Sequence, residues 1–230
     1  VSNILNMKKS IKTYLKRPSK DNTNRSANPS VTRASTILFD TMQELKKHEL
    51  KIKLNKKITH FSYGRYGSST TIELGNILKK LENAYHVFLT GTGFGGIALA
   101  LMSLCRPGDE ILVSDNVYGP TKEISEKLLK EFNINALFYN PDSFEDLKNK
   151  VTKKTKMILI ENPGSITFEF QDLSKIVSLA KKNNILTLLD NTWGTPLYLK
   201  PLELGFDMSF SSATKYFSGH SDAMGGSLAV

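Results

Sequence analysis

Short apolar runs alternate with amphipathic stretches over the last two thirds of the chain. Between 70 and 84, the apolar residues Ile77, Leu78 and Leu81 recur at helical spacing, whereas the run 157–160 is aliphatic throughout and typical of a buried strand. The same criteria predict strands at 87–89, 110–113, 136–138, 157–160, 185–189, 208–210 and 227–230. They predict helices at 70–84, 97–104, 121–132, 144–151 and 173–183.

Strands that alternate with helices are typical of a mostly parallel sheet with helices on both faces. We therefore predict an α/β fold, a three-layer α/β/α domain around a mostly parallel sheet of the seven-stranded type. In such folds, ligands bind at the carboxyl ends of the strands. The loops that follow the apolar runs are therefore the places to look for functional residues.

The first 60 residues lack this regularity. An extended stretch at 31–39 and a short helix at 42–53 are the only elements predicted there. Residues 1–60 carry 14 Lys and Arg against 4 Asp and Glu, whereas residues 61–230 carry 17 against 18, so the whole excess of positive charge lies in the first quarter. A basic segment can bind nucleic acid or an anionic surface. Aromatic residues are few there and no nucleic-acid motif occurs, so we interpret residues 1–60 as a solvated basic arm without a nucleic-acid partner.

The composition excludes several classes of protein. Hydrophobic residues make up 40% and charged residues 23%, which is usual for a globular protein and excludes disorder of the whole chain. The single cysteine, Cys105, excludes an intramolecular disulfide and a multi-cysteine metal centre, and we predict no metal site. The longest apolar run, 96–105, is too short to span a bilayer, and no apolar segment follows Lys8 and Lys9 as in a signal peptide. We expect a protein of the reducing cytoplasm with no membrane contact.

A glycine-rich loop, Gly91–Gly96, follows one predicted strand and precedes a predicted helix. It contains the pattern GxGxxG, and Asp115 ends the next strand 19 residues later, so the dinucleotide-binding fingerprint is met as written. Backbone N–H groups at such a helix start can bind a phosphate. A nicotinamide dinucleotide and a glycine-rich helix packed tightly on the sheet remain alternatives at this point.

Asp190 and Lys215 occupy two later strand ends. Asp190 directly follows a buried aliphatic run, which is costly unless the carboxylate meets a partner such as a cationic ring nitrogen. Lys215 lies among the hydroxyl residues Ser212 and Thr214, and an amine in a partly desolvated site has a lowered pKa and can bond to an aldehyde. A loop carboxylate and a surface lysine are the ordinary alternatives. Together with the Gly93 loop, these residues suit pyridoxal phosphate, whereas a nicotinamide dinucleotide needs neither the acid nor the lysine.

An ordered set of motifs from about Val31 to Val230 resembles the Cys/Met-metabolism family of pyridoxal-phosphate enzymes, which have the type I fold. The motifs are Tyr63-Gly64-Arg65, Gly93-Phe94, Val117-Tyr118-Gly119-Pro120, Glu161-Asn162-Pro163-Gly164-Ser165-Ile166-Thr167, Asp190-Asn191-Thr192-Trp193 and Ser212-Ala213-Thr214-Lys215. Ser165 and Trp193 resemble the cystathionine beta-lyase branch, because the gamma-acting members typically carry Asn and Phe at these positions.

The resemblance implies a role for each candidate residue. Lys215 would hold the cofactor covalently and move a proton, Asp190 would keep the pyridine nitrogen protonated, and Tyr118 would stack on the ring and help in proton transfer. Phosphate contacts would come from the backbone N–H groups of Gly93 and Phe94 and from the hydroxyls of Ser212 and Thr214. Tyr63 and Arg65 would reach the phosphate of a neighbouring subunit.

The resemblance also implies an activity and an organisation. The reaction would be the alpha,beta-elimination of cystathionine to homocysteine, pyruvate and ammonia, in a homo-oligomer built as a dimer of dimers. Residues 1–60 would be an arm that contacts a partner subunit, and residues 61–230 the cofactor-binding large domain. The chain ends 15 residues after Lys215, so we expect the family's C-terminal small domain, with its arginine for the substrate carboxylate, to be absent. A gamma-acting relative, an inactive truncated remnant and a dinucleotide-binding protein remain the alternatives.

Overall fold

The computed structural model describes residues 28–54 and 61–230, which form two compact units that divide between Ile77 and Leu78. Each unit is treated by itself. Residues 1–27 and 55–60 lie outside the described residues, so the predicted basic arm is described only in part.

The first unit contains the predicted helix of the arm. Helix α2 spans Met42–Lys53, and the hydroxyl of its N-cap Thr41 accepts the backbone N–H of Glu44 at 3.2 Å, which confirms this prediction. The stretch 31–39 forms no strand, and a single antiparallel bridge joins Thr36 to Tyr63. The short helix η2 (Gly64–Tyr66) follows, and helix α3 (Ser69–Glu82) leads into the second unit.

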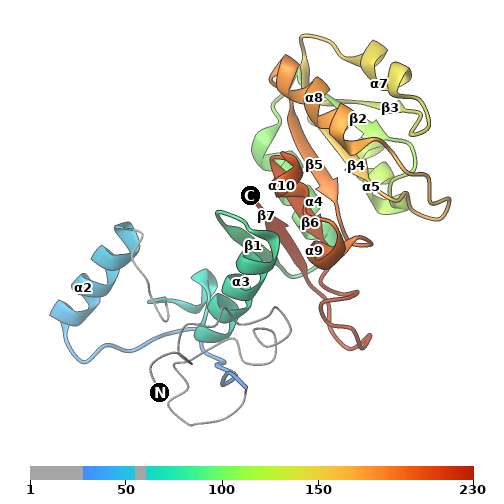
Figure 1. The fold of residues 1–230 in the computed structure, drawn as a ribbon. Coiled ribbons are helices and arrows are strands. Elements are labelled where there is room, and N and C mark those ends of the chain that lie inside the picture. Colours follow the sequence, from blue (N-terminus) through green and yellow to red (C-terminus); the bar gives the residue numbers. More distant parts are fainter. Residues whose placement is uncertain (1–27, 55–60) are drawn as a thin grey trace, which may run out of the picture. The chain divides into compact units, whose positions relative to one another are not determined.

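The second unit is built on one sheet of seven strands (Figure 1). The strands are β1 (Val87–Thr90), β2 (Glu110–Ser114), β3 (Asn135–Tyr139), β4 (Thr155–Glu161), β5 (Leu186–Asp190), β6 (Met208–Ser211) and β7 (Gly226–Ala229). Their order is β1-β7-β6-β5-β4-β2-β3, and only β7 runs antiparallel to its neighbours. All seven predicted strands are confirmed, as is the mostly parallel sheet.

Helices cover both faces of this sheet, because alternate residues of the central strands are apolar on both sides. Ile111 and Leu159 belong to one buried core with helix α4 (Gly93–Leu104). Leu112 and Ile160 belong to a second core with helix α8 and the shorter α7. Helix α7 spans Phe144–Lys150 and helix α8 spans Leu173–Asn183. The predicted three-layer architecture is therefore confirmed.

The helices differ from the prediction in three respects. Helix α4 begins at Gly93 rather than Ile97, because the hydroxyl of Thr92 caps its first turn. The predicted helix 121–132 is interrupted: α5 (Gly119–Glu123) runs into the π-helical turn η3 (Ile124–Leu128) and then α6 (Leu129–Glu131). Two short helices, α9 (Thr195–Tyr198) and α10 (Pro201–Leu204), each have a proline within their first two residues and were not predicted.

The strand order contradicts the dinucleotide-binding interpretation of the glycine loop. That fold needs the loop strand to be central and parallel to the strand that carries the acid. Here β1 is an edge strand that pairs only with the reversed strand β7, and four strands separate it from β2, so it is not central. Asp115, at the end of β2, forms an ion pair with Lys122 instead.

Among the described residues, no helix is long and apolar enough to cross a bilayer. Within residues 28–54 and 61–230, no three His, Cys, Asp or Glu side chains gather where they could bind a metal ion.

Candidate functional site

The start of helix α4 forms an anion-binding turn against the end of strand β6. Thr92 Oγ1 accepts the N–H of Gly95 at 3.0 Å, which leaves the first-turn N–H groups of Gly93 and Phe94 without an acceptor in their own helix. A Cβ added to Gly93 would lie 2.6 Å from Ser212 Oγ, so only glycine allows this close approach. Two backbone donors and one hydroxyl therefore converge where the predicted phosphate would bind.

Asp190 ends strand β5 and is only 8% exposed. Its neighbour two residues back, Leu188, belongs to the core under α4, so Asp190 points to the α4 face of the sheet. Burial raises the pKa of Asp190, and donation from the backbone N–H of Thr192 at 3.0 Å opposes that shift. No ion pair joins this carboxyl to a cationic side chain in the described part of the chain.

Thr192 connects these two parts of the site. Its N–H donates to Asp190, and its Oγ1 accepts the N–H of Ser212 at 2.8 Å. Thr192 thus fixes the buried Asp190 relative to Ser212 and the proposed phosphate-binding turn. Thr192 was not among the predicted site residues, although its N–H bond to Asp190 forms an Asx turn, a local structure that Asp favours.

Glu161 is a second acid at the same sheet edge, and it was not among the predicted site residues. It ends β4 and is the register partner of Asp190 in the parallel β4–β5 pair. Its Oε2 accepts the backbone N–H of Tyr118 at 2.6 Å. Burial first, and the charge of Asp190 second, raise the pKa of Glu161. Its position directly after an apolar run is the signal that also marked Asp190.

Lys215 lies in a turn after β6, where its N–H donates to the carbonyl of Ser212 at 3.1 Å. Lys215 is exposed, because it lies in a turn at the rim of the sheet; desolvation of its amine stays a prediction. Thr214 is held by Gly225, whose N–H it accepts at 3.1 Å and whose carbonyl it donates to at 3.2 Å. Its hydroxyl hydrogen is therefore directed at the backbone in this structure.

Three aromatic side chains from separate loops meet next to Lys215. The ring of Trp193 lies 5.3 Å from that of Phe168 and 6.2 Å from that of Tyr216, in both cases edge to face. All three rings are about half exposed. Tyr118, the N-cap of α5, is likewise 52% exposed.

Tyr63 and Arg65 belong to the first unit. The guanidinium carbon of Arg65 lies 5.2 Å from the ring centre of Tyr63 and 5.5 Å from that of Tyr66. The two rings hold the Arg65 guanidinium in one orientation through cation–π contacts. Their role at a neighbouring subunit's phosphate stays a prediction.

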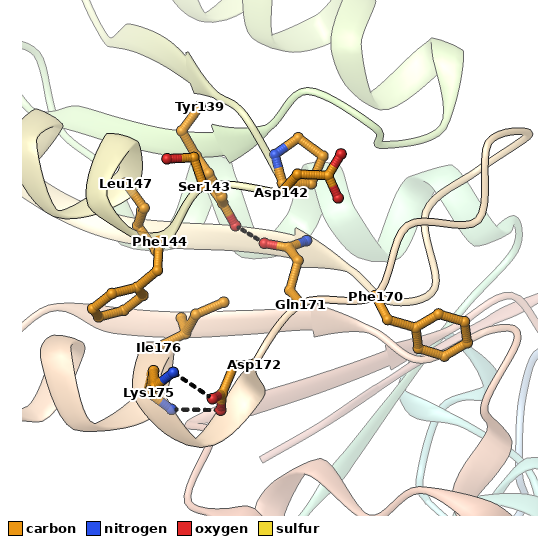
Figure 2. A pocket seen from close by; sticks show the side chains of 11 residues that line it. Tyr139, Asp142, Ser143, Phe144, Leu147, Phe170, Gln171, Asp172, Lys175 and Ile176 are labelled. Carbon is orange, nitrogen blue, oxygen red and sulfur yellow. Dashed lines mark hydrogen bonds and ion pairs between the residues drawn. The ribbon is translucent and has the colours of Figure 1, made fainter.

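A cavity of about 270 Å³ lies elsewhere, between the end of β3 and the start of α8 (Figure 2). Figure 2 shows two pairs among its polar groups: Tyr139 donates to Gln171 at 2.7 Å, and Lys175 lies 3.2 Å from Asp172. It contains none of the predicted cofactor residues.

A family model described as Cys/Met metabolism PLP-dependent enzyme matches residues 12–230. The chain belongs to this family. Cystathionine beta-lyase from Bordetella avium is 35% identical over 200 residues, which is 87% of this chain and 49% of that protein. L-alanine/L-glutamate racemase from Wolbachia pipientis is 32% identical over 208 residues, or 88% of this chain and 51% of the relative.

Solved structures agree on the fold. The cystathionine gamma synthase of Xanthomonas oryzae pv. oryzae, in complex with aminoacrylate and cysteine, superposes with a TM-score of 0.86 at 28% identity. The match covers 97% of this chain and 55% of that one. The second unit therefore has the type I fold of pyridoxal-phosphate enzymes, and the chain spans about half the length of the curated relatives it matches.

The residues of this Cys/Met-metabolism chain fit the family's cofactor, pyridoxal phosphate. The buried carboxyl of Asp190 lacks a cationic partner from the described chain, and a protonated ring nitrogen would supply one. The Gly93 turn, which a Cβ would fill, offers N–H donors to an anion.

Proposed function

We propose that this chain carries the cofactor-binding part of a pyridoxal-phosphate-dependent carbon–sulfur lyase that acts on L-cystathionine by alpha,beta-elimination. The products would be homocysteine, pyruvate and ammonia. The observation that carries the proposal is the Thr192 link, which connects the buried Asp190 by hydrogen bonds to Ser212, beside the Gly93 turn. Such fixed geometry is what a site needs to orient a cofactor without reorganisation.

The chain's own residues would share the work. Pyridoxal phosphate supplies a ring that accepts electrons from the substrate's alpha carbon. The Asp190 carboxylate would hold a proton on the ring nitrogen, and the N–H groups of Gly93 and Phe94 would hold the phosphate together with Ser212 and Thr214. Lys215 Nζ would bind the cofactor covalently and then take the alpha proton of the substrate. Tyr118 would cover the ring.

Beta rather than gamma elimination is supported by Ser165 and Trp193 and by the beta-lyase names of relatives at similar identity. The racemase relative, at 32% identity, makes racemisation the second candidate, since it too begins with removal of the alpha proton. The substrate class is sulfur amino acids, with cystine and cysteine as alternatives to cystathionine.

The remaining predictions concern assembly. We propose a homo-oligomer, in which Tyr63 and Arg65 reach the phosphate of a neighbouring subunit and residues 1–60 contact that subunit. Relatives are about twice as long as this chain, so the activity of the whole protein depends on more than the described site.

The test begins with an absorption spectrum of the purified chain with added pyridoxal phosphate. Borohydride reduction and peptide mapping follow. We expect a yellow band and a single reduced adduct on Lys215. Lys215→Ala would abolish both, whereas Lys130→Ala, at an exposed helical lysine, would change neither. No band, or adducts scattered over surface lysines, would contradict the proposed site.

Product analysis then separates the activities. Pyruvate from cystathionine supports beta elimination, 2-oxobutyrate supports a gamma-acting enzyme, and a D-amino acid without ammonia supports a racemase. A labelled Lys215 with no turnover of any of these substrates would favour a cofactor-binding but inactive chain.

A further inference from the structure

Two carboxyl groups lie side by side at the edge of the sheet where the cofactor is proposed to bind. Glu161 and Asp190 are register partners in parallel strands. The residues two positions before them, Leu159 and Leu188, share the core under α4, so both acids point to that face. Only Asp190 was a predicted site residue.

The two acids have different hydrogen-bond partners. Asp190 is stabilised as an anion by Thr192, through both its backbone and its side chain. Glu161 has one donor, the N–H of Tyr118 at 2.6 Å. The charged group that acts on Glu161 is Asp190, from β5; the β2 side contributes the Tyr118 N–H rather than a charge. Two neighbouring carboxylates, of which Asp190 is buried and Glu161 partly buried, cannot both ionise cheaply, so the one with fewer donors keeps the proton.

We propose that Glu161 is a positioning residue of the cofactor site, which in its protonated form holds the Tyr118 turn beside Asp190 and leaves the pair's single negative charge on Asp190. The proposal rests on the proposed function for the identity of the ligand. It assigns Glu161 no contact with the cofactor or the substrate.

The geometry gives this role a physical meaning. Contacts run from Tyr118 to Glu161, on to Asp190, and through Thr192 to Ser212, and so cross the ends of β2, β4, β5 and β6. A protonated Glu161 satisfies the Tyr118 N–H without adding a second charge near the ring nitrogen. An ionised Glu161 would compete with Asp190 for the ring-nitrogen proton.

The first test needs no cofactor. Carbon-13 NMR of the full chain, with labelled Glu and Asp carboxyls, follows each titration between pH 3 and 9. We expect the Glu161 carboxyl to remain protonated at pH values where exposed glutamates are ionised. Asp190→Asn should lower the Glu161 midpoint by a pH unit or more, and Glu161→Gln should lower that of Asp190. If Glu161 titrates with the exposed glutamates, or ignores Asp190→Asn, the proposal is overturned.

The second test separates a neutral role from a charged one. Pyridoxal-phosphate affinity is measured at pH 7.5 by quenching of Trp193, the only tryptophan of the chain. Glu161→Gln keeps an acceptor for Tyr118 and should bind within about twofold of the parent, whereas Glu161→Ala should bind about tenfold more weakly. The control is Glu145→Gln, because the Glu145 side chain on α7 is exposed. Equal losses in the Gln and Ala variants would contradict a neutral Glu161.

These outcomes are distinct from a failure of the proposed function. If the parent chain does not bind pyridoxal phosphate on Lys215, the lyase proposal fails, yet the carboxyl titrations still decide which acid holds the proton.

Discussion

Asp190 ends strand β5 and Lys215 follows the adjacent strand β6, but the two side chains have very different surroundings. Asp190 is 8% exposed, is part of the sheet and accepts a hydrogen bond from Thr192. Lys215 lies beyond the last residue of β6, in a turn, with an exposed side chain. The acid is therefore fixed by the interior of the fold, and the amine only by its turn.

This difference separates two parts of cofactor binding. The ring-nitrogen and phosphate sides are preorganised, because moving Asp190 or Gly93 would disturb buried strands and a tight helix contact. The amine side can adjust, and we expect its cover to come from the cofactor itself and from the assembled protein. The variants below alter one side at a time.

The largest expected effect follows the loss of charge at Asp190. Asp190→Asn keeps an oxygen for the Thr192 N–H but removes the partner of the ring nitrogen. We expect the affinity for pyridoxal phosphate to fall about a hundredfold, or roughly 3 kcal/mol. Without cofactor, the melting temperature at pH 8 should stay the same or rise, because burial raises the pKa of Asp190 and its ionisation costs stability. A loss of both affinity and stability would mean that the acid is structural.

Glu82 tests whether burial of an acid is by itself a sign of function. It is 1% exposed, and burial raises its pKa from 4.5 to about 7, opposed by the Ser209 hydroxyl and by Lys200. The folded pKa exceeds the unfolded one, so its stabilising contribution is complete below pH 4.5 and is lost as pH rises through about 7. Glu82→Gln should therefore be more stable than the parent at pH 8, by up to about 3 kcal/mol, with no advantage at pH 4.5.

Thermal unfolding at several pH values measures this difference, with Glu145→Gln as a surface control. Cofactor affinity should not change. Parallel stability profiles of parent and Glu82→Gln would show that Glu82 does not titrate as its burial requires.

The sequence predicted the sheet well because burial on both faces leaves an unmistakable aliphatic run. The ends of the helices and the short helices were harder to predict. The start of α4 depends on the Thr92 cap, which outweighs the low helix propensity of the three glycines in its first turn, Gly93, Gly95 and Gly96. The π-helical turn η3 and the four-residue helices α9 and α10 are too short or irregular to produce a periodic pattern.

The features of the site also differ in how well the sequence predicts them. Position after an apolar run marked both residues as candidates. Glu161 was missed because its meaning depends on its register against β5, and strand register is a tertiary property. Exposure of Lys215 is also set by tertiary structure, so the expected desolvation could not be checked from the sequence.

Gly93→Ala tests the preorganised phosphate side. The added Cβ would approach Ser212 Oγ to 2.6 Å, so the helix start or β6 must shift. We expect a loss of about 1–3 kcal/mol in unfolding free energy and a weaker affinity for pyridoxal phosphate. Gly91→Ala is the matched control, because a Cβ there meets no atom within 4 Å. Equal behaviour of the two variants would contradict a tight contact at Gly93.

The smallest expected effect lies on the amine side. Tyr216→Leu removes the ring that meets Trp193 at 6.2 Å and so loosens the turn of Lys215. We expect the local stability of residues 213–219 to fall by about 0.5–1 kcal/mol, so that their amide hydrogens exchange faster. The exchange rates of the β5 amides should stay unchanged. Tyr198→Leu, at a side chain that is 90% exposed, should alter neither. If exchange in β5 quickened equally, the turn and the buried acid would belong to one cooperative unit, and the contrast between Asp190 and Lys215 would be one of exposure only.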